Sequence, residues 1–534
     1  MKLLTLLLSA IIVNGSLIPD VNVRTHLEAI CKAAGHEITF AADGPHIDAP
    51  VGMALTNLSM TYVRKNVYGP NPPGLNRNIG SLAAACVWFE TLTGESCIGN
   101  GYIPAVMWSE PERVEVAQLC AHAACLNPDS PTDVGMKNIF HEVLVEPEGE
   151  CVLQDPLRME NGRRVRSVAQ WNRKRRPELF AMFEHEMFGR APGRPEQLHF
   201  ETVYRDTEAL GGKAVRKEVK VHFDNTGDHY LRLLIYTPAG AKGAVPAFLG
   251  INFKGNWAVS PEEGISMPTP EELERYGRVE TLERGVHAFR WPVEEILAAG
   301  YGVATFYTGD VDPDFDDCFE NGVHPLFFKP GQDYPEPDEW GTIAAWAWGL
   351  SRALDYLETD ADVDASRVAV IGHSRLGKTA LWAGAADTRF AMVISNDSGN
   401  CGAALTCRKF GETVARVNYW NPQWFCDNFM KYNFNVEALP FDQHELIALI
   451  APRPVCIGSA TEDYYADPRG EFLAAKGASS VYELFGLEGL SGAEFPEPDT
   501  YVGEGPLRYQ LRSGKHNILI ADWRQYLKFA DKYL

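Results

Sequence analysis

The sequence predicts an α/β fold over the C-terminal two thirds of the chain, with a mostly parallel β-sheet that carries helices on both faces. From about residue 200 onward, short apolar runs alternate with longer helical segments. The runs contain too few polar residues for strands with one face in water, so we expect a sheet buried on both sides. The predicted strands are 231–238, 244–253, 301–307, 367–373, 390–397, 453–460 and 481–489.

The segments between these runs have the length and apolar spacing of helices that pack on a sheet. Residues 339–358 and 378–387 predict two such helices, and residues 522–534 predict a terminal one. Ahead of the sheet, residues 164–189 predict an amphipathic helix with a basic start. Parallel sheets bind ligands at the carboxyl ends of their strands, so we look for chemistry in the loops that follow the runs.

Length and composition indicate how the chain is divided into domains. With 534 residues it exceeds the roughly 250 to 300 residues at which a single core stops growing, so we expect more than one domain. The apolar fraction of 45% and the charged fraction of 22% are typical of globular proteins. We predict a smaller, α-rich accessory region at 1–130, a linker at 131–150 and the α/β domain at 151–534.

The formal net charge of −22 argues against nucleic acid as a partner, because a polyanion would be repelled. After the first residues, no segment reaches the roughly 18 to 20 consecutive apolar residues of a membrane span, so we expect no membrane partner. We also expect the protein to be a monomer. Residues 3–13 are apolar and follow Lys2. They form either a signal peptide of about residues 1–15, which implies a secreted or periplasmic protein, or a buried strand or helix of the first domain.

The eleven cysteines are an odd number spread over a long chain, which indicates buried thiols and not a disulfide framework. Cys120, His122 and Cys125 lie close enough to suggest a metal site, but they fall in the alanine-rich stretch 117–126, where helix packing explains them. The acidic stretch 309–319 could bind calcium, but we expect a solvated loop. The sequence therefore predicts no metal and no cofactor.

A serine stands between a predicted strand and a predicted helix. The strand 367–373 runs directly into Ser374, and Gly372 and Gly377 flank the serine. A sharp turn of this kind exposes the hydroxyl, and the helix start that follows offers backbone N–H groups to a developing oxyanion. The pattern departs from GxSxG, since Leu376 takes the place of the second glycine. In this context it predicts the nucleophile of an α/β-hydrolase fold.

A serine nucleophile needs a histidine base and a carboxylate that orients this histidine. In the α/β-hydrolase fold the acid follows the serine along the chain and the histidine comes last. His516 lies between the last predicted strand and the terminal helix, where the base belongs. Two residues are candidates for the carboxylate that orients the histidine. Asp463 follows the strand 453–460, and Asp397 ends the strand 390–397. Asp463 ranks first, because the loop after the penultimate strand is the usual origin of the acid.

Several longer stretches resemble one known family. Residues 339–399, which include the serine motif, are similar to the bacterial branch of the glucuronoyl esterases, carbohydrate esterase family 15. The resemblance extends from about Asp155 to the C-terminus and includes 175–189, 250–257, 290–310, 409–414 and 467–472. Members of that family hydrolyse the ester between 4-O-methylglucuronic acid side chains of xylan and lignin alcohols, and they need no metal. The resemblance implies the same reaction here.

The resemblance also assigns roles to individual residues. It implies Ser374 as the nucleophile, His516 as the base and Arg375 as a cation that stabilises the oxyanion beside backbone N–H groups. A fixed, planar guanidinium suits that role. Lys378 would bind sugar hydroxyls or the ring oxygen, and Glu412 would accept hydrogen bonds from sugar hydroxyls.

This chain departs from the family pattern at some positions. Tyr465 stands two residues past Asp463, where members often have Trp, so a stacking face remains but its size differs. His373 occupies the place of a disulfide-bonded cysteine of fungal members, so we do not expect that bridge. The family uses either acid position, often with Glu where this chain has Asp397.

The N-terminal region has a more fragmentary resemblance. Residues 40–48 and 80–104 resemble the C-terminal end of SGNH-type hydrolases, with Asp43 and His46 at the places of the acid and the base. The nucleophile block that this family requires is missing, and only about forty residues precede Asp43. We therefore expect a truncated, inactive accessory region, unless a partner acts in trans or the start codon is misassigned.

These features predict a serine esterase that hydrolyses esters of (4-O-methyl)glucuronic acid through an acyl-enzyme on Ser374, with glucuronoxylan or a lignin–carbohydrate ester as substrate. Two alternatives stay open. The first is a broader carbohydrate esterase, such as an acetyl xylan esterase, for which Lys378 and Glu412 would not matter. The second is a polysaccharide-binding protein with degenerate hydrolase domains, against which the intact serine, histidine and acids argue.

Overall fold

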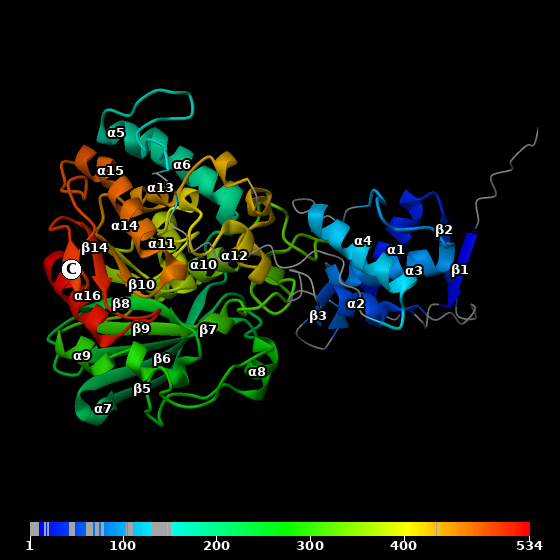
Figure 1. Cartoon of the computed structure of the whole chain (residues 1–534). Helices are drawn as coiled ribbons and strands as arrows, with labels where there is room; N and C mark the ends of the chain where they lie inside the picture. The colour runs from blue at the N-terminus through cyan, green and yellow to red at the C-terminus, as the bar shows by residue number, and fades with distance from the viewer. Residues whose placement is uncertain are drawn as a thin grey trace, which may run out of the picture. The chain divides into compact units, whose positions relative to one another are not determined.

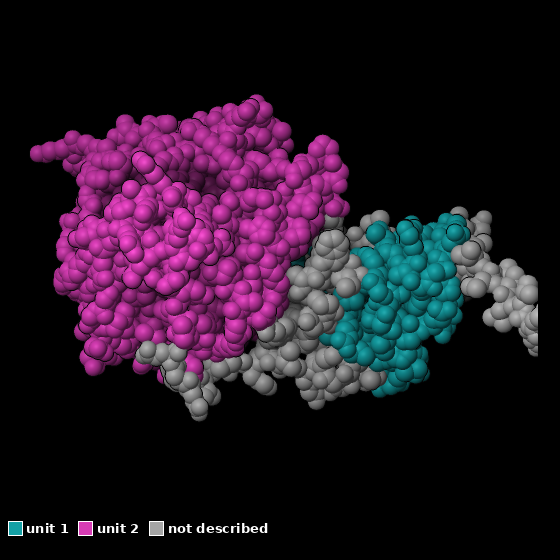
Figure 2. All heavy atoms as spheres, turned by 90° about the horizontal axis from the view of Figure 1, so that it is seen from above, with its two compact units in different colours: residues 1–141, 315–318 teal, residues 142–314, 319–534 magenta. Residues whose placement is uncertain are grey.

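The computed structural model divides the chain into two compact units. One unit holds residues 1–141 with 315–318, and the other holds residues 142–314 with 319–534 (Figure 2). The residues that the structure describes are 10–14, 18, 21–41, 49–59, 68–69, 74–75, 79–102, 104, 111–130, 147, 151–433 and 435–534.

Two of the N-terminal predictions concern residues outside these stretches. The predicted linker 131–150 lies outside the described residues except for residue 147, so its bounds stay a prediction. Asp43 and His46, the residues matched to the acid and base of another hydrolase family, also lie outside the described residues. The resemblance of this region to SGNH-type hydrolases therefore stays untested.

The first unit contains a parallel β-α-β arrangement. Strand β1 (Ala10–Asn14) pairs in parallel with β2 (Glu37–Ala41), and α1 (Val21–Ala33) connects them, as parallel strands require. The described part of the N-terminal apolar run is therefore a strand of this unit, while residues 1–9 lie outside the described residues. The other elements are α2 (Val51–Ser59), β3 (Tyr68–Gly69), β4 (Gly74–Leu75), α3 (Ile79–Thr93) and α4 (Pro111–Leu126).

Helices α3 and α4 carry the apolar, alanine-rich sequences of this unit. The residues of α3 from Ile79 to Glu90 are all buried, so this helix is covered on every side. On α4, Cys120 is buried, and Nδ1 of His122 lies 3.0 Å from a carboxylate oxygen of Glu90. The prediction that residues 117–126 form a packed helix is confirmed.

The second unit is built on a mostly parallel sheet, as predicted. Among the described residues, this sheet has ten strands, which lie in the order β13-β14-β12-β11-β10-β8-β9-β7-β6-β5. The strands from β14 to β9 in this order are parallel to their neighbours, and the pairs at both ends are antiparallel. The strands are β5 (His199–Glu208), β6 (Ala214–His222), β7 (Tyr230–Pro238), β8 (Val245–Asn252), β9 (Gly302–Tyr307), β10 (Val363–His373), β11 (Met392–Asn396), β12 (Val455–Ala460), β13 (Thr500–Val502) and β14 (Leu507–Arg512).

One predicted strand is wrong, and the strand before the histidine loop was not predicted. The stretch 481–489 begins within a helix, since an apolar run of this length is ambiguous between the two structures. The last parallel strand is β14, in which Arg508, Gln510 and Arg512 alternate with apolar residues. These three side chains are buried as well, so the strand lies in the core without being an apolar run. Strands β5 and β6 were not predicted either, because their sequences contain many charged residues; β6 is mostly buried, whereas β5 is mostly exposed.

Helices cover both faces of this sheet (Figure 1). On β10, Val368 and Val370 belong to the core that α10 and α11 complete, whereas Ala369 and Ile371 belong to the core that α9 and α16 complete. Alternate residues thus face opposite apolar layers, which explains why the central strands are apolar throughout. The helices are α5 (Val168–Gln170), α6 (Arg176–Phe183), α7 (Ala209–Gly212), α8 (Pro270–Tyr276), α9 (Val293–Ala298), α10 (Thr342–Leu357), α11 (Arg375–Ala386), α12 (Val414–Trp420), α13 (Gln443–Ala448), α14 (Pro468–Gly477), α15 (Ser479–Leu484) and α16 (Ile520–Tyr533).

The second unit contains a disulfide that the sequence did not predict. Cys151, near the start of the unit, is bonded to Cys407 in the short helix η10 (Thr406–Arg408). The other nine cysteines are free, and all of them except Cys125 are buried, which confirms the prediction of buried thiols for most positions. No helix in the described part of the chain has both the length and the apolar character to cross a bilayer.

Candidate active site

Ser374 forms the turn between strand β10, which ends at His373, and helix α11, which starts at Arg375. Its backbone has φ 60° and ψ −131°, a strained conformation that non-glycine residues rarely adopt outside functional turns. Gly372 makes the turn possible, because a Cβ at this position would lie 1.8 Å from the carbonyl oxygen of Leu376. The turn therefore has the strand–serine–helix arrangement that exposes a nucleophile.

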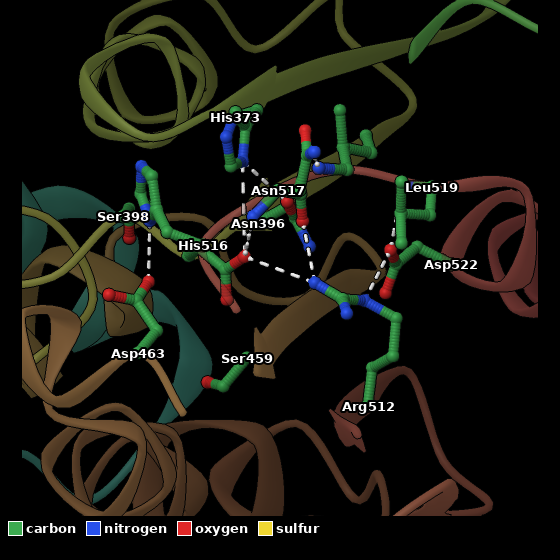
Figure 3. A network of polar contacts seen from close by, with 12 residues as sticks. His373, Asn396, Ser398, Ser459, Asp463, Arg512, His516, Asn517, Leu519 and Asp522 are labelled. Atoms are coloured by element: carbon green, nitrogen blue, oxygen red, sulfur yellow. Dashed lines mark hydrogen bonds and ion pairs between the residues drawn. The ribbon is translucent and has the colours of Figure 1, made fainter. Parts of the chain in front are cut away.

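His516 lies in the loop between β14 and α16, and its Nδ1 donates a 2.5 Å hydrogen bond to Oδ2 of Asp463 (Figure 3). The ring of His516 lies 4.6 Å, centroid to centroid, from the ring of His373, which directly precedes Ser374. The side chain of His516 is 43% exposed and that of Asp463 is 3% exposed, so the imidazole reaches solvent while the carboxylate is sheltered. The ends of β10, β12 and β14 thus bring the predicted nucleophile, acid and base to one edge of the sheet.

Asp397, the second candidate acid, has different surroundings. Its Oδ2 accepts a 3.3 Å hydrogen bond from the backbone N–H of Asn517 and lies 3.8 Å from the guanidinium of Arg512. Its Oδ1 is buried and has no hydrogen-bond partner among the described residues. Burial raises the pKa of Asp397 well above its ordinary value, and the charge of Asp463 raises it further. Asp463 therefore holds the ring of His516, and Asp397 binds the backbone next to it.

A third buried acid, Glu471 on α14, fixes the loop that follows Asp397. Its carboxylate accepts hydrogen bonds from the backbone N–H groups of Ser398 and Gly399, both at 2.9 Å, and from the hydroxyl of Ser459 on β12. Burial raises the pKa of Glu471 to about 8. This carboxyl group joins the ends of β11 and β12 to the start of α14, so it supports the strand ends that carry both candidate acids.

The guanidinium of Arg375 is fixed by surrounding side chains. Its Nη1 donates to Oδ2 of Asp314, and its Cζ lies 5.1 Å from the ring centre of Trp424 and 5.5 Å from that of Phe253. Asp314 is held in turn by the indole N–H of Trp424 at 3.0 Å. A cation that is already fixed beside Ser374 can stabilise an oxyanion without reorganisation.

Asp314 belongs to the acidic stretch 309–319, and the expectation of a solvated loop there is wrong. Asp310 and Asp312 are buried. Asp310 accepts a 2.6 Å hydrogen bond from the hydroxyl of Tyr276. A buried carboxylate needs hydrogen-bond partners. The surrounding residues supply them here, so these two aspartates can lie inside the fold.

Lys378 lies on α11, one turn after Ser374, and is buried. Its Nζ donates to the carbonyl oxygens of Ser398 and Asn400, both at 2.6 Å, and lies 3.2 Å from Oε2 of Glu412. The structure thus pairs the two residues predicted to bind sugar, but the three N–H donors of the ammonium group already have protein acceptors. The side chain of Glu412 is 31% exposed, so it is the member of the pair that faces solvent.

Tyr465 lies two residues past Asp463 and is 40% exposed. Its carbonyl oxygen accepts a 3.1 Å hydrogen bond from the backbone N–H of Glu412, so the two lie on adjoining loops. Cζ of Arg416 lies 4.9 Å from the ring centre of Tyr465 and 4.9 Å from that of Trp420, which is 38% exposed. Exposed aromatic faces next to a carboxylate are typical of a surface that binds sugar rings.

Asp397, Asp463 and His516 could also be considered as metal ligands. Their ligand-type atoms lie within 4.8 Å of one another, the one such group found among the described residues. The Arg512 guanidinium, 3.8 Å from Asp397, would repel a cation at this place. The group therefore suits proton transfer, and the absence of a metal or cofactor stays a prediction.

Several residues that support the site were not predicted. Asp314, Trp424 and Glu471 act through tertiary contacts with residues far away in the sequence, so no local pattern marks them. One signal did exist for Asp314, because it closely follows the strand predicted at 301–307 and so had to lie near the functional edge of the sheet.

Comparisons with known proteins find carbohydrate esterases. The family model for fungal glucuronyl esterases matches residues 304–486. A carbohydrate esterase, MZ0003, from an unknown prokaryotic organism is 51% identical over 389 residues, which cover 72% of this chain and 89% of that protein. The solved glucuronoyl esterase from Solibacter usitatus is 46% identical, with a TM-score of 0.68 over 72% of this chain and 98% of its own. A promiscuous CE15 esterase from a marine bacterial metagenome is 50% identical, with a TM-score of 0.66 and the same coverage.

Proposed function

This chain belongs to the glucuronoyl esterases of carbohydrate esterase family 15, and on that premise we propose that it hydrolyses esters of (4-O-methyl)glucuronic acid through an acyl-enzyme on Ser374. The observation that carries the proposal is the hydrogen bond between His516 and Asp463 at the strand ends next to the serine turn. The guanidinium of Arg375, fixed at the start of α11, supports the same reaction.

The residues divide the work of acyl transfer among them. His516 takes the proton of the Ser374 hydroxyl as its oxygen attacks the ester carbonyl, and Asp463 stabilises the imidazolium through the hydrogen bond to Nδ1. Arg375 and the backbone N–H groups at the start of α11 stabilise the negative charge on the carbonyl oxygen. His516 then protonates the departing alcohol, and the acyl group stays on the serine. Water then gives a proton to His516 and attacks this ester. His516 returns the proton to the Ser374 oxygen as the bond between serine and the acyl group breaks and the uronic acid leaves.

We propose that the sugar of the substrate lies against Glu412 and Tyr465. The exposed carboxylate of Glu412 accepts hydrogen bonds from sugar hydroxyls, and Tyr465 offers an aromatic face. Lys378 holds Glu412 in place in the free enzyme, and it reaches a sugar hydroxyl only if it gives up one of its carbonyl partners. The substrates are glucuronoxylan or lignin–carbohydrate esters.

A polymer of this kind is degraded outside the cytoplasm, and we propose a secreted or periplasmic location. The disulfide between Cys151 and Cys407 supports this location, because disulfides persist in oxidising compartments. The first unit is proposed as an accessory domain without a second active site.

The test is a serine variant with a matched control. Ser374→Ala should lower kcat for benzyl glucuronate by at least about 10⁴-fold, because the nucleophile is gone, while the circular dichroism spectrum stays unchanged. Ser366→Ala, at an exposed serine of β10, should keep full activity. Activity retained in the Ser374 variant would rule out the acyl-enzyme, and glycan binding without any turnover by the wild type would favour a binding protein.

A broader carbohydrate esterase is the second candidate, since one of the similar solved structures is of a promiscuous CE15 esterase. Glu412→Gln separates the two candidates. A glucuronate-specific enzyme should lose about tenfold or more in kcat/KM for benzyl glucuronate, because an acceptor for sugar hydroxyls is lost. If acetyl xylan is hydrolysed faster than benzyl glucuronate and Glu412→Gln changes neither rate, the broader activity is the correct one.

A further inference from the structure

Arg290 lies in the long segment between β8 and α9, just before the helix starts. Its carbonyl oxygen accepts a 2.8 Å hydrogen bond from the indole N–H of Trp523 on α16, the helix that follows the His516 loop. The backbone of Arg290 is therefore bonded to the first turn of the helix that follows the His516 loop.

The side chain of Arg290 approaches the reacting groups through Phe253. Its Cζ lies 5.6 Å from the ring centre of Phe253, and Cζ of Arg375 lies 5.5 Å from the same centre. The ring of Phe253 also meets the ring of His373 edge-on, with centroids 6.2 Å apart. One phenyl ring thus joins two guanidinium groups and the residue that precedes Ser374.

The two arginines differ in their partners. Arg375 is paired with Asp314, whereas no carboxylate of the described residues forms an ion pair with Arg290. The Nε atoms of both arginines are buried without a hydrogen-bond partner among these residues. Burial lowers the pKa of Arg290, and the charge of Arg375 lowers it further. The nearby Lys254 is paired with Glu280. A half-buried guanidinium beside a second one, and without its own acid, is a place that an anion stabilises.

Ester hydrolysis supplies negative charge at this place only after the reaction starts. The carbonyl of the ester is neutral, the tetrahedral intermediate carries an oxyanion, and the released uronic acid carries a carboxylate. We propose that Arg290 is a second cation of the acyl site, whose guanidinium acts with Arg375 to stabilise the oxyanion and to bind the carboxylate of the released uronic acid. This inference rests on the proposed function, and it names a residue and a product-binding role beyond it.

The test compares Arg290→Gln with Arg290→Lys in the full chain. The Gln variant should lower kcat for benzyl glucuronate about tenfold and raise the inhibition constant of free glucuronate about tenfold or more, with a much smaller change in KM, because the ester lacks the charge that Arg290 attracts. The Lys variant keeps the charge and should recover most of both losses. Added KCl should raise the inhibition constant of the wild type more steeply than that of the Gln variant.

Arg284→Gln is the matched control, because this arginine of the same segment donates to the carbonyl oxygen of Glu262. It should leave kcat and glucuronate inhibition unchanged. Turnover with unchanged kcat and unchanged glucuronate inhibition in folded Arg290→Gln would overturn this inference and leave the proposed function intact. If Arg290→Gln does not fold, Arg290→Lys alone provides the test. Complete loss of glucuronate inhibition in this variant, although it keeps the positive charge, would overturn the inference. Absence of turnover in the wild type would overturn the proposed function, and this inference with it.

Discussion

At the scale of single residues, two aspartates at neighbouring strand ends have different surroundings. Asp463 accepts a hydrogen bond from Nδ1 of His516, which keeps the imidazole in one tautomer. Asp397 is buried, has an oxygen without a partner among the described residues, and has a pKa that burial and Asp463 hold well above the ordinary value. Burial and the nearby Asp463 thus both disfavour a negative charge on Asp397.

The pair of variants Asp463→Asn and Asp397→Asn tests this division. Asp463→Asn should lower kcat by about 10³- to 10⁴-fold, because an amide cannot stabilise the imidazolium. Asp397→Asn should lower kcat by less than about tenfold, since asparagine resembles a protonated aspartate in shape and charge. Steady-state kinetics on benzyl glucuronate measures both. Equal losses would show that the two acids share the role.

The clamp on Arg375 is a second residue-scale prediction. Asp314→Asn removes the ion pair, so the guanidinium loses its fixed position, and kcat should fall by about 10-fold to 100-fold with little change in KM. Trp424→Phe keeps an aromatic ring under Arg375 but removes the N–H donor to Asp314, and it should have a smaller effect. A kcat that is unchanged in Asp314→Asn would show that Arg375 holds its position by stacking alone.

The positions of the serine turn, the histidine and its aspartate partner were predictable from sequence, because each follows or precedes an element with a strong local pattern. Ser374 stands between a strand and a helix, and His516 stands before the terminal helix. The residues that support them could not be predicted from sequence, because their partners are defined only by the tertiary structure. Asp314 carries no local signal that it pairs with Arg375, and its acidic neighbours suggested a solvated loop instead.

At the scale of elements, helix α14 connects the acid loops to the sheet. Asp467 caps the helix by accepting from the backbone N–H of Gly470, as its place before a proline suggests. One turn later, Glu471 binds the backbone after β11 and the hydroxyl of Ser459 on β12. The helix therefore holds two strand ends at a fixed distance, and its buried acid makes that connection sensitive to pH.

Glu471 should make the stability of the second unit fall as pH rises. Its pKa is raised from 4.5 to about 8 by burial, so between these values the folded state holds a proton that the unfolded state has released. The free energy of unfolding should therefore decrease with rising pH by at most about 1.4 kcal/mol per pH unit from this group. Glu471→Gln removes this dependence while keeping an acceptor.

The measurement is thermal unfolding of both proteins between pH 5 and pH 8.5. The melting temperature of Glu471→Gln minus that of the wild type should increase steadily over this range. A difference that stays constant with pH would mean that Glu471 is ionised in the folded protein throughout.

Strands were predictable to the extent that they are apolar on both faces. The prediction holds for β7 to β12 because these strands lie between two apolar layers. It fails for β14, whose buried polar side chains have partners elsewhere: Arg512 bonds to Asp522 on α16, and Arg508 lies over the ring of Phe529. A strand of this kind is recognisable only when those partners are known.

At the scale of the whole molecule, the disulfide closes a long loop, since Cys151 and Cys407 are 256 residues apart. Loss of the bridge should lower the free energy of unfolding by about 2 to 4 kcal/mol. Thermal unfolding with and without a reductant measures the effect. The variant carrying Cys151→Ser and Cys407→Ser should melt like the reduced wild type and should not respond to reductant. A wild-type melting temperature that is independent of reductant would show that the bridge does not form.

The serine turn and the histidine loop lie far apart in the order of synthesis. Ser374 and its turn are synthesised well before β14 and α16, between which His516 lies. A nascent chain can therefore complete the serine turn on the ribosome while it still lacks a base. By the mechanism proposed above, such a chain is inactive until the last strand has paired with β12, so hydrolysis reports that the sheet is complete. For the same reason, a truncation that removes β14 and α16 would leave the serine turn without His516.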